Sequence, residues 1–511
     1  MKVNQLKAGA VMSYLIIGLG SLISIVYTPV MLRLLGQNEF GLYNLVGSVV
    51  AYLGLFNFGF GSAYFKYYSA YKVNNDKESI AKLNGMFMLI FLVLGALALI
   101  SGAILTIYSD AVFGAKLSAE ELHRAKILMV LMVANIGITF PCIVFNSYVT
   151  ATEKFVFQKS LHIAKIITSP FLTLPVLILG YGSIGMAFVT TLINLIIELI
   201  NIYFSYKKVH IQFSYKNLDF KLVKELFIFS SFIFMNLIVN QINWNVDRFI
   251  IGRFKGTAEV AVYSIASQLN SYYLQLSTAV SGVYIPRVNA LVASNNGDSE
   301  LSKLFTKIGR VQFLLLSGIL LGLIFFGKAF IELWAGKTYS PAYAMALVLI
   351  IPVTIPLIQN LGIEIQRAKN MHKFRSWVYL FIALGNIGLS IPLTKLYGGL
   401  GASIGTAVAL VIGNVIVMNW YYHKKVGLNI KDFSKSILQV FPALILPAVA
   451  GTLMMIYLNL REVKIMLPSM IVFAVIFAIS MWKLGMKKSE KDLILKPLAR
   501  VTSKFKQKNK A

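Results

Sequence analysis

Residues 82–107 read KLNGMFMLIFLVLGALALISGAILTI, and no charged residue follows Lys82 in this stretch. A helix needs about 20 predominantly apolar residues to cross the hydrocarbon core of a bilayer, so this stretch predicts a membrane-spanning helix. Similar runs lie near residues 8–32, 40–65, 125–150, 155–179, 183–205, 223–252, 259–285, 308–334, 341–366, 374–394, 401–422, 436–458 and 464–482. The sequence therefore predicts an all-α, polytopic membrane protein with about 14 transmembrane helices.

The composition of the 511-residue chain supports this class, because 57% of the residues are hydrophobic and only 13% are charged. A soluble globular chain carries about 25% charged residues. The net charge of +28 lies in short segments between the apolar runs, which is the usual bias of cytoplasmic loops and argues against nucleic acid as a partner. The single cysteine, Cys142, excludes an intrachain disulfide and a thiolate metal site.

The distribution of basic residues predicts the orientation of the chain. With the N-terminus inside, the inner segments hold 36 of the 48 Lys and Arg residues, the outer segments hold 11, and Arg248 lies within a span. Because cytoplasmic loops are enriched in Lys and Arg, both termini are expected in the cytoplasm. This bias holds loop by loop, which also favours an even number of helices.

Two junctions between predicted spans share the pattern R-x-x-G-x-x-E-x-x-x-Y. Residues 33–43 read RLLGQNEFGLY, and residues 253–263 read RFKGTAEVAVY. A Y-G-x-x-G motif likewise recurs, as YGSIG at 181–185 and YGGLG at 397–401. Helices one to six therefore repeat as helices seven to twelve in the same orientation, because six is an even number. The predicted domains are an N-lobe of helices 1–6, a C-lobe of helices 7–12, and helices 13 and 14 with a basic cytoplasmic tail, at residues 1–208, 209–425 and 426–511.

The junction motif also has a local structural interpretation. Gly36 and Gly256 can each end one helix in a left-handed turn. Glu39 and Glu259 then lie in the first turn of the next helix, where the helix dipole favours an acid. We therefore expect both glutamates to be structural residues.

These features resemble the lipid-linked oligosaccharide flippases, the polysaccharide-transporter branch of the multidrug/oligosaccharidyl-lipid/polysaccharide (MOP) exporter superfamily. The resemblance covers the whole chain. It rests on the layout of twelve helices plus two, on the junction motifs, on the run Asn245-Val-Asp-Arg-Phe-Ile-Ile-Gly-Arg253, and on Tyr284-Ile-Pro-Arg287.

The resemblance implies two six-helix lobes that form a V around a lumen. It implies a flippase that moves an undecaprenyl-diphosphate-linked oligosaccharide, a polysaccharide repeat unit, from the cytoplasmic to the outer leaflet by alternating access. The location implied is the bacterial cytoplasmic membrane, and an H⁺ or Na⁺ gradient is the expected drive, without any other cofactor. Besides the membrane lipids, a glycan polymerase and other envelope-assembly proteins are the expected partners.

Charged residues within or at the ends of predicted spans are the candidate site residues, because a charge in lipid is costly unless it faces a partner or water. A diphosphate needs several positive donors, and arginine can bind phosphate oxygens bidentately. An alternative role for the basic residues is to extend to the headgroups, or, for Arg248, to pair with a neighbour. The candidate lumen cations for substrate are Arg248, Arg33, Lys66, Arg287 and Arg367, and the candidate acids for a coupling ion are Glu198, Asp247 and Glu364.

Three other functions remain as alternatives. A multidrug exporter of the same superfamily would bind cationic drugs with acidic lumen residues, and the excess of basic candidates argues against it. An integral-membrane glycan-processing enzyme would need a reactive constellation. The five histidines show no paired spacing and no large outer loop is predicted, so neither catalytic residues nor a metal site are expected. The third alternative, a non-transporting scaffold, is disfavoured by the polar residues inside the spans.

Overall fold

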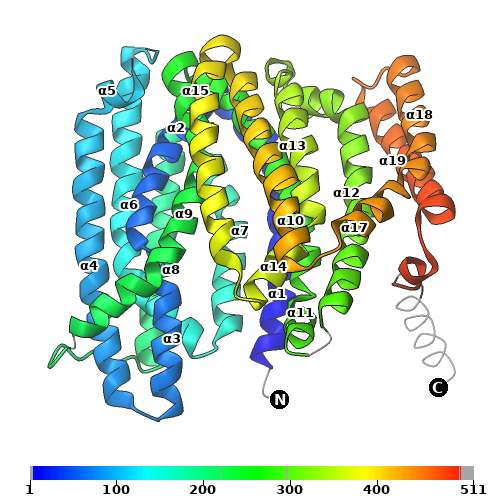
Figure 1. Ribbon diagram of the computed structural model, residues 1–511. Helices are drawn as coiled ribbons and strands as arrows, with labels where there is room; N and C mark the ends of the chain where they lie inside the picture. The colour runs from blue at the N-terminus through cyan, green and yellow to red at the C-terminus, as the bar shows by residue number, and fades with distance from the viewer. Residues whose placement is uncertain (1–3, 115, 219, 295–296, 494, 496–511) are drawn as a thin grey trace, which may run out of the picture. The chain divides into compact units, whose positions relative to one another are not determined.

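The computed structural model describes residues 4–114, 116–218, 220–294, 297–493 and 495. Every regular element in these ranges is a helix, which confirms the all-α prediction (Figure 1). The end of the predicted basic tail, from residue 496 onward, lies outside the described residues. The chain forms two compact units, which do not coincide with single stretches of sequence. The lobe boundaries predicted from the repeat stay a prediction.

The first unit comprises Met1–Ser264 and Ala383–Gly405. Its most extensive helix contacts join α4 to α6, α1 to α7 and α6 to α8. Its elements are α1 (Gln5–Leu35), α2 (Gln37–Val50), η1 (Ala51–Asn57), α3 (Phe60–Val73), α4 (Lys77–Ile107), α5 (Ser109–Phe113), α6 (Ala119–Ala151), α7 (Phe155–Ile178), α8 (Gly182–Lys207) and α9 (Phe220–Lys255).

The second unit comprises Ile265–Ile382 and Thr406–Ala511. Two helices run from one unit into the other along the chain, α10 (Thr257–Gly282) and α15 (His372–Leu410). The remaining elements are α11 (Ile285–Val292), α12 (Gly297–Trp334), η2 (Lys337–Tyr339), α13 (Ala342–Ile358), α14 (Leu361–Ala368), η3 (Val411–Met418), α16 (Asn419–Tyr421), η4 (Tyr422–Val426), α17 (Ile430–Leu438), α18 (Phe441–Tyr457), α19 (Val463–Ser480) and η5 (Met481–Gly485).

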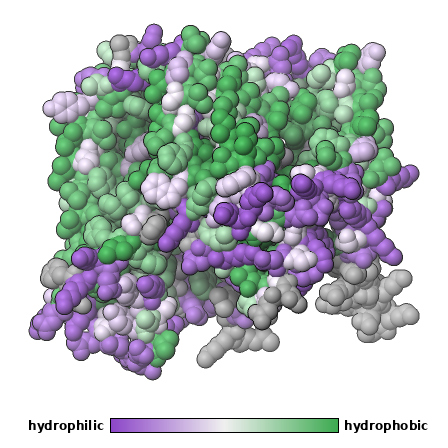
Figure 2. Space-filling model, in the orientation of Figure 1, coloured by the Kyte–Doolittle hydropathy of each residue, from purple (hydrophilic) through white to green (hydrophobic). Residues whose placement is uncertain are grey.

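Among the described residues, ten helices are long and apolar enough to cross a membrane, or twelve if each of two bent pairs is one span. Polar residues are frequent in α10, so this helix is not one of them. The continuous helical stretch Lys373–Val426, which begins with α15, contains two of the predicted runs and is interrupted at Gly398, which has φ +63°. A total of fourteen spans therefore stays a prediction. Figure 2 shows hydrophobic side chains over the flanks of the helices and hydrophilic ones near their ends.

The second predicted span is broken between η1 and α3, where two successive residues adopt left-handed backbone conformations. Phe58 has φ +50° and Gly59 has φ +72°. The Phe58 ring stacks on Phe234 of α9 with 4.4 Å between ring centroids. A Cβ at Gly59 would lie 2.4 Å from the Cγ2 atom of Ile233, so only glycine allows α9 to approach this closely. Packing against α9 therefore holds the break in place.

The predicted helix boundaries at the two junctions are confirmed. Gly36 has φ +77° and directly precedes α2, while Gly256 has φ +89° and directly precedes α10. Glu39 and Glu259 lie in the first turns of these two helices. The left-handed glycine ends one helix, and the next helix starts with an acid near its positive end.

Each of these acids also binds the Y-G-x-x-G motif of its own predicted half. The backbone N–H of Ser183 donates to Oε2 of Glu39 at 2.7 Å, and Arg124 forms an ion pair with the same carboxylate. The N–H of Gly399 donates to Oε1 of Glu259 at 2.9 Å. The two motifs found by internal repetition are thus joined by the same kind of contact in both halves.

We expect Glu259→Ala to destabilise the protein by about 1–3 kcal/mol, because the buried N–H of Gly399 loses its acceptor. Glu259→Gln keeps a side-chain oxygen at the same place and should cost clearly less. The measurement is the thermal unfolding midpoint of each purified variant in detergent. An unchanged midpoint in Glu259→Ala would show that this contact contributes nothing to stability.

Candidate functional site

Asp247 of α9 is held inside the protein rather than exposed to lipid. Its side chain is only 1% exposed. The hydroxyl of Tyr263, a buried residue of α10, donates to Oδ2 of Asp247 at 2.7 Å. Tyr263 is the last residue of the second R-x-x-G-x-x-E-x-x-x-Y motif, so that motif supplies the partner of a predicted site residue. This contact was not predicted from the sequence.

Arg248 follows directly on α9 and is half-buried. Its Nη1 donates to Oδ1 of Asn245 at 3.3 Å, and its charge is attracted by the carboxylate of Asp247. The alternative role of Arg248, pairing with a neighbour, therefore has partners in the structure. A guanidinium has five N–H donors in one plane, enough to hold Asn245 and also to bind phosphate oxygens.

Two further predicted cations of the first unit are exposed. Arg33 lies in the last turn of α1. Lys66 lies on α3, and its Nζ is 4.8 Å from the ring centre of Phe229 and 5.3 Å from that of Tyr67. A lysine over aromatic faces is weakly held, since such contacts at exposed sites contribute about 0.5–1 kcal/mol. Lys66 therefore retains a charge that can meet another ligand.

Glu198 of α8 belongs to a polar cluster shared by three helices of the first unit. The Nδ2 of Asn146 on α6 donates to both carboxylate oxygens of Glu198, at 3.0 Å and 3.3 Å. The Nδ2 of Asn201 donates in turn to Oδ1 of Asn146 at 2.8 Å. Lys165 of α7 supplies an opposite charge that interacts with Glu198. Folding thus gives this acid a basic neighbour, although no basic residue lies within one turn of it on α8.

The three remaining predicted residues lie in the second unit. Arg287 is exposed on α11. Arg367 and Glu364 form an ion pair on α14, with 3.0 Å between Nη1 and Oε1. The sites predicted as substrate cation and coupling acid on α14 therefore partly neutralise each other. Among the described residues, no group of three or more His, Cys, Asp or Glu side chains could hold a metal ion.

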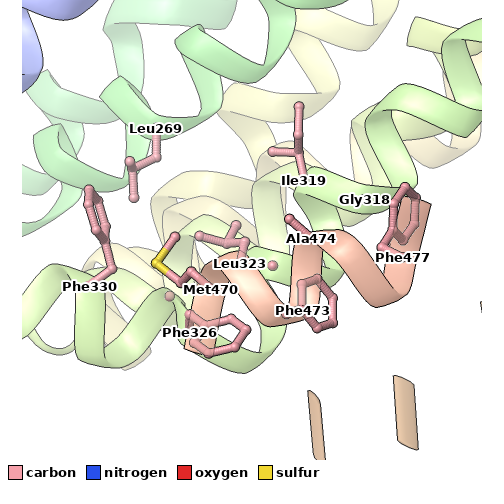
Figure 3. A pocket seen from close by; sticks show the side chains of 12 residues that line it. Leu269, Gly318, Ile319, Leu323, Phe326, Phe330, Met470, Phe473, Ala474 and Phe477 are labelled. Carbon is pink, nitrogen blue, oxygen red and sulfur yellow. The ribbon is translucent and has the colours of Figure 1, made fainter. Parts of the chain in front are cut away.

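The second unit also contains an apolar pocket between α10, α12 and α19, with a volume of about 440 Å³ (Figure 3). Leu269 projects from α10, Phe326 from α12, and Met470 and Phe473 from α19. Gly322 of α12 leaves room for these side chains. A pocket of this chemistry can accept an alkyl or isoprenoid chain but offers nothing to bind a phosphate or a sugar.

The fold defines a class of protein. The chain is similar to the lipid II flippase MurJ in an inward closed conformation, with a TM-score of 0.69 and 18% identity. The similarity covers 96% of this chain and 99% of the MurJ chain. It is also similar to an inward-facing multidrug resistance MATE transporter of the MOP superfamily, over 82% and 96% of the two chains, with a TM-score of 0.61 and 15% identity. The chain has the fold of MOP-superfamily transporters.

The chain belongs to the family described as polysaccharide biosynthesis protein, whose model matches residues 6–292. It is 23% identical over 410 residues to the "Putative O-antigen transporter" of Shigella flexneri, covering 79% of this chain and 94% of that protein. It is 24% identical over 225 residues to the teichuronic acid biosynthesis protein TuaB of Bacillus subtilis, covering 44% and 46%. The predicted membership in the polysaccharide-transporter branch of the MOP superfamily is confirmed.

Proposed function

We propose that this protein is a flippase for an undecaprenyl-diphosphate-linked oligosaccharide. It moves the repeat unit from the cytoplasmic to the outer leaflet of the bacterial cytoplasmic membrane by alternating access, with both termini in the cytoplasm. The observation that carries the proposal is the half-buried Arg248 beside the buried Asp247 in α9, one of the two bent pairs of membrane-spanning length, in a polysaccharide-family chain. A charge kept inside a span normally serves a substrate or ion pathway.

The substrate has two chemically distinct parts that need different surroundings. Its diphosphate carries negative charge that must leave bulk water during translocation, and Arg248 offers a planar set of donors suited to phosphate. Its isoprenoid chain needs only apolar contact, and the pocket of the second unit between α10, α12 and α19 has the chemistry for such a chain (Figure 3). Arg33, Lys66, Arg287 and Arg367 are further cations for the diphosphate or for acidic sugars.

Translocation makes and breaks no covalent bond, so we infer that the protein is not an enzyme. The names of its relatives, a transporter and flippases, fit this inference. The likeness to multidrug transporters concerns the fold alone. An exporter of cationic drugs would need accessible carboxylates, whereas Asp247 is buried against Tyr263 and Glu364 is paired with Arg367.

The decisive experiment reconstitutes the purified protein in liposomes that contain a fluorescent lipid-linked oligosaccharide. We expect the protein to expose the inner-leaflet glycan to an external reagent, while a cationic dye in the lumen stays inside. The opposite result, dye export without glycan movement, would support a multidrug exporter. Absence of glycan movement across several glycans and imposed H⁺ or Na⁺ gradients would end the flippase proposal.

We further propose that Glu198 couples transport to a proton gradient, because its amide partners and Lys165 place a titratable acid in a charged setting. Glu198→Gln should abolish the acceleration by an imposed pH gradient while passive glycolipid movement remains. The matched control is Glu78→Gln, which removes an exposed acid already paired with Lys82. Continued acceleration in Glu198→Gln would exclude Glu198, and acceleration by Na⁺ alone would identify a different coupling ion.

A further inference from the structure

A buried arginine fastens three separate segments of the second unit. Arg310 of α12 is 3% exposed, and its Nε donates to Oε1 of Glu490 at 2.6 Å. Its terminal nitrogens donate to the carbonyl oxygens of Ser436 in α17 and Gly485 in η5. Glu490 is also 3% exposed, and its other oxygen accepts the backbone N–H of Lys487 at 2.8 Å. The residues after η5 are thus attached to α12 at a defined position.

Stability alone is a poor reason to keep such a pair. The desolvation of two buried charges often cancels their attraction, and apolar side chains of similar volume can do as well or better. The pair instead fixes the orientation of the attached segments, because a planar guanidinium binds several acceptors at defined angles. The pair therefore fixes which side chains the attached segments present to their surroundings.

Helix α17 lies on α12 through one aromatic side chain. The Phe433 ring is 4.8 Å from that of Phe305, and a Cβ at Gly309 would lie 2.4 Å from Cε2 of Phe433. The side of α17 that carries Phe433 is therefore buried. Lys431 and Lys435 of the same helix are exposed.

Around this attachment lies a group of exposed lysines that we call the lysine platform: Lys431, Lys435, Lys483, Lys487 and Lys488. Exposed apolar side chains accompany it, with Leu438 62% exposed and Leu484 64% exposed. Arg310 neutralises Glu490, whereas the exposed Asp432 accepts only a neutral amide from Asn429 and offsets one of the five lysine charges. The platform therefore presents positive charge next to exposed apolar side chains.

We propose that the lysine platform is a docking surface for anionic phospholipid headgroups of the cytoplasmic leaflet, with the Arg310–Glu490 pair fixing its geometry. Lysines beside exposed leucines fit a membrane boundary, where the ammonium groups meet phosphates and the leucines enter the acyl region. An acidic protein would satisfy the lysines but leave the leucines without an apolar partner. The platform shares no residue with the apolar pocket or with the polar contacts of Arg248, and its occupancy can be measured without transport.

The test compares two variants with equal charge loss, in nanodiscs of phosphatidylcholine with a spin-labelled phosphatidylglycerol probe. The platform variant is Lys431→Gln, Lys435→Gln, Lys487→Gln and Lys488→Gln. The matched control replaces four exposed lysines on the predicted cytoplasmic side of the first unit, Lys77→Gln, Lys154→Gln, Lys207→Gln and Lys208→Gln. We expect at least about a fivefold loss of probe affinity in the first variant and little change in the second. Equal loss in both would show a general charge effect and overturn the proposal.

A second arm tests the geometry and the identity of the ligand. Glu490→Gln keeps every lysine of the platform and an oxygen near Arg310, and it should still lower the affinity for the probe. Wild-type affinity in Glu490→Gln would remove the pair from the proposal. Inorganic pyrophosphate should not displace the lipid probe, whereas displacement by it or by polyglutamate would identify a soluble anion or an acidic protein segment as the occupant.

Discussion

Arg248→Ala will lower the initial rate of glycolipid translocation in liposomes by about 10- to 100-fold. A hydrogen bond from a charged donor contributes about 1.5–3 kcal/mol, which corresponds to this range of rates if the bond forms while the diphosphate crosses. The unfolding midpoint distinguishes a loss of substrate contact from a loss of stability, because the guanidinium of Arg248 also donates to Asn245 at 3.3 Å. The measurements are the translocation rate and the thermal unfolding midpoint of the same preparation.

Two variants make this result specific. Lys255→Ala removes an exposed cation from the end of the same helix and should transport at the wild-type rate. Arg248→Lys keeps the charge without the planar set of donors and should give an intermediate rate. A wild-type rate in Arg248→Ala would show that Arg248 does not contact the substrate.

Arg310→Ala should produce the largest loss of stability, about 3–5 kcal/mol, because it leaves the Glu490 carboxylate buried without its partner. Thermal unfolding in detergent measures this loss. Arg310→Met combined with Glu490→Leu should recover most of it, since no unpaired charge remains in the interior. If the double variant is as unstable as Arg310→Ala, the hydrogen bonds of Arg310 to Ser436 and Gly485, rather than the charge pair, account for the effect.

The spans could be predicted because the bilayer imposes a minimum length of apolar sequence. The run predicted at 82–107 corresponds to α4, which begins earlier, at Lys77. Asp76 caps the helix there, with the N–H of Ser79 donating to its Oδ1 at 2.9 Å, and hydrogen bonds from Ser79 lower the pKa of Asp76. Caps extend a helix into polar sequence, where hydropathy carries no signal.

The break in the second span could not be predicted. A phenylalanine rarely adopts a positive φ, and nothing local in the sequence requires one at Phe58. Stacking on Phe234 and the close approach of Ile233 to Gly59 impose it, and both partners lie on α9. Only the contact between distant helices determines this backbone conformation.

The charged residues of the candidate site can be recognised in the sequence, but their partners cannot. Asp247 and Arg248 stood out as charges within an apolar run. Asp247 and Tyr263 are 16 residues apart, one on each side of the turn at Gly256. Pairing the two helices of this junction as a hairpin would have suggested the contact. Lys165 lies within the predicted run 155–179, but only the packing of α7 on α8 brings its charge near Glu198.

The contacts of Glu39 and Glu259 show how little sequence a shared attachment requires. Both acids bind a backbone N–H, which every residue except proline supplies, and the donors are serine at 183 and glycine at 399. The residue before each donor has less freedom, because a Cβ would lie 2.3 Å from the Glu39 carboxylate at Gly182 and 2.6 Å from that of Glu259 at Gly398. Two stretches that carry the predicted repeat can therefore differ at most other positions while an acid and a glycine in each preserve the same attachment.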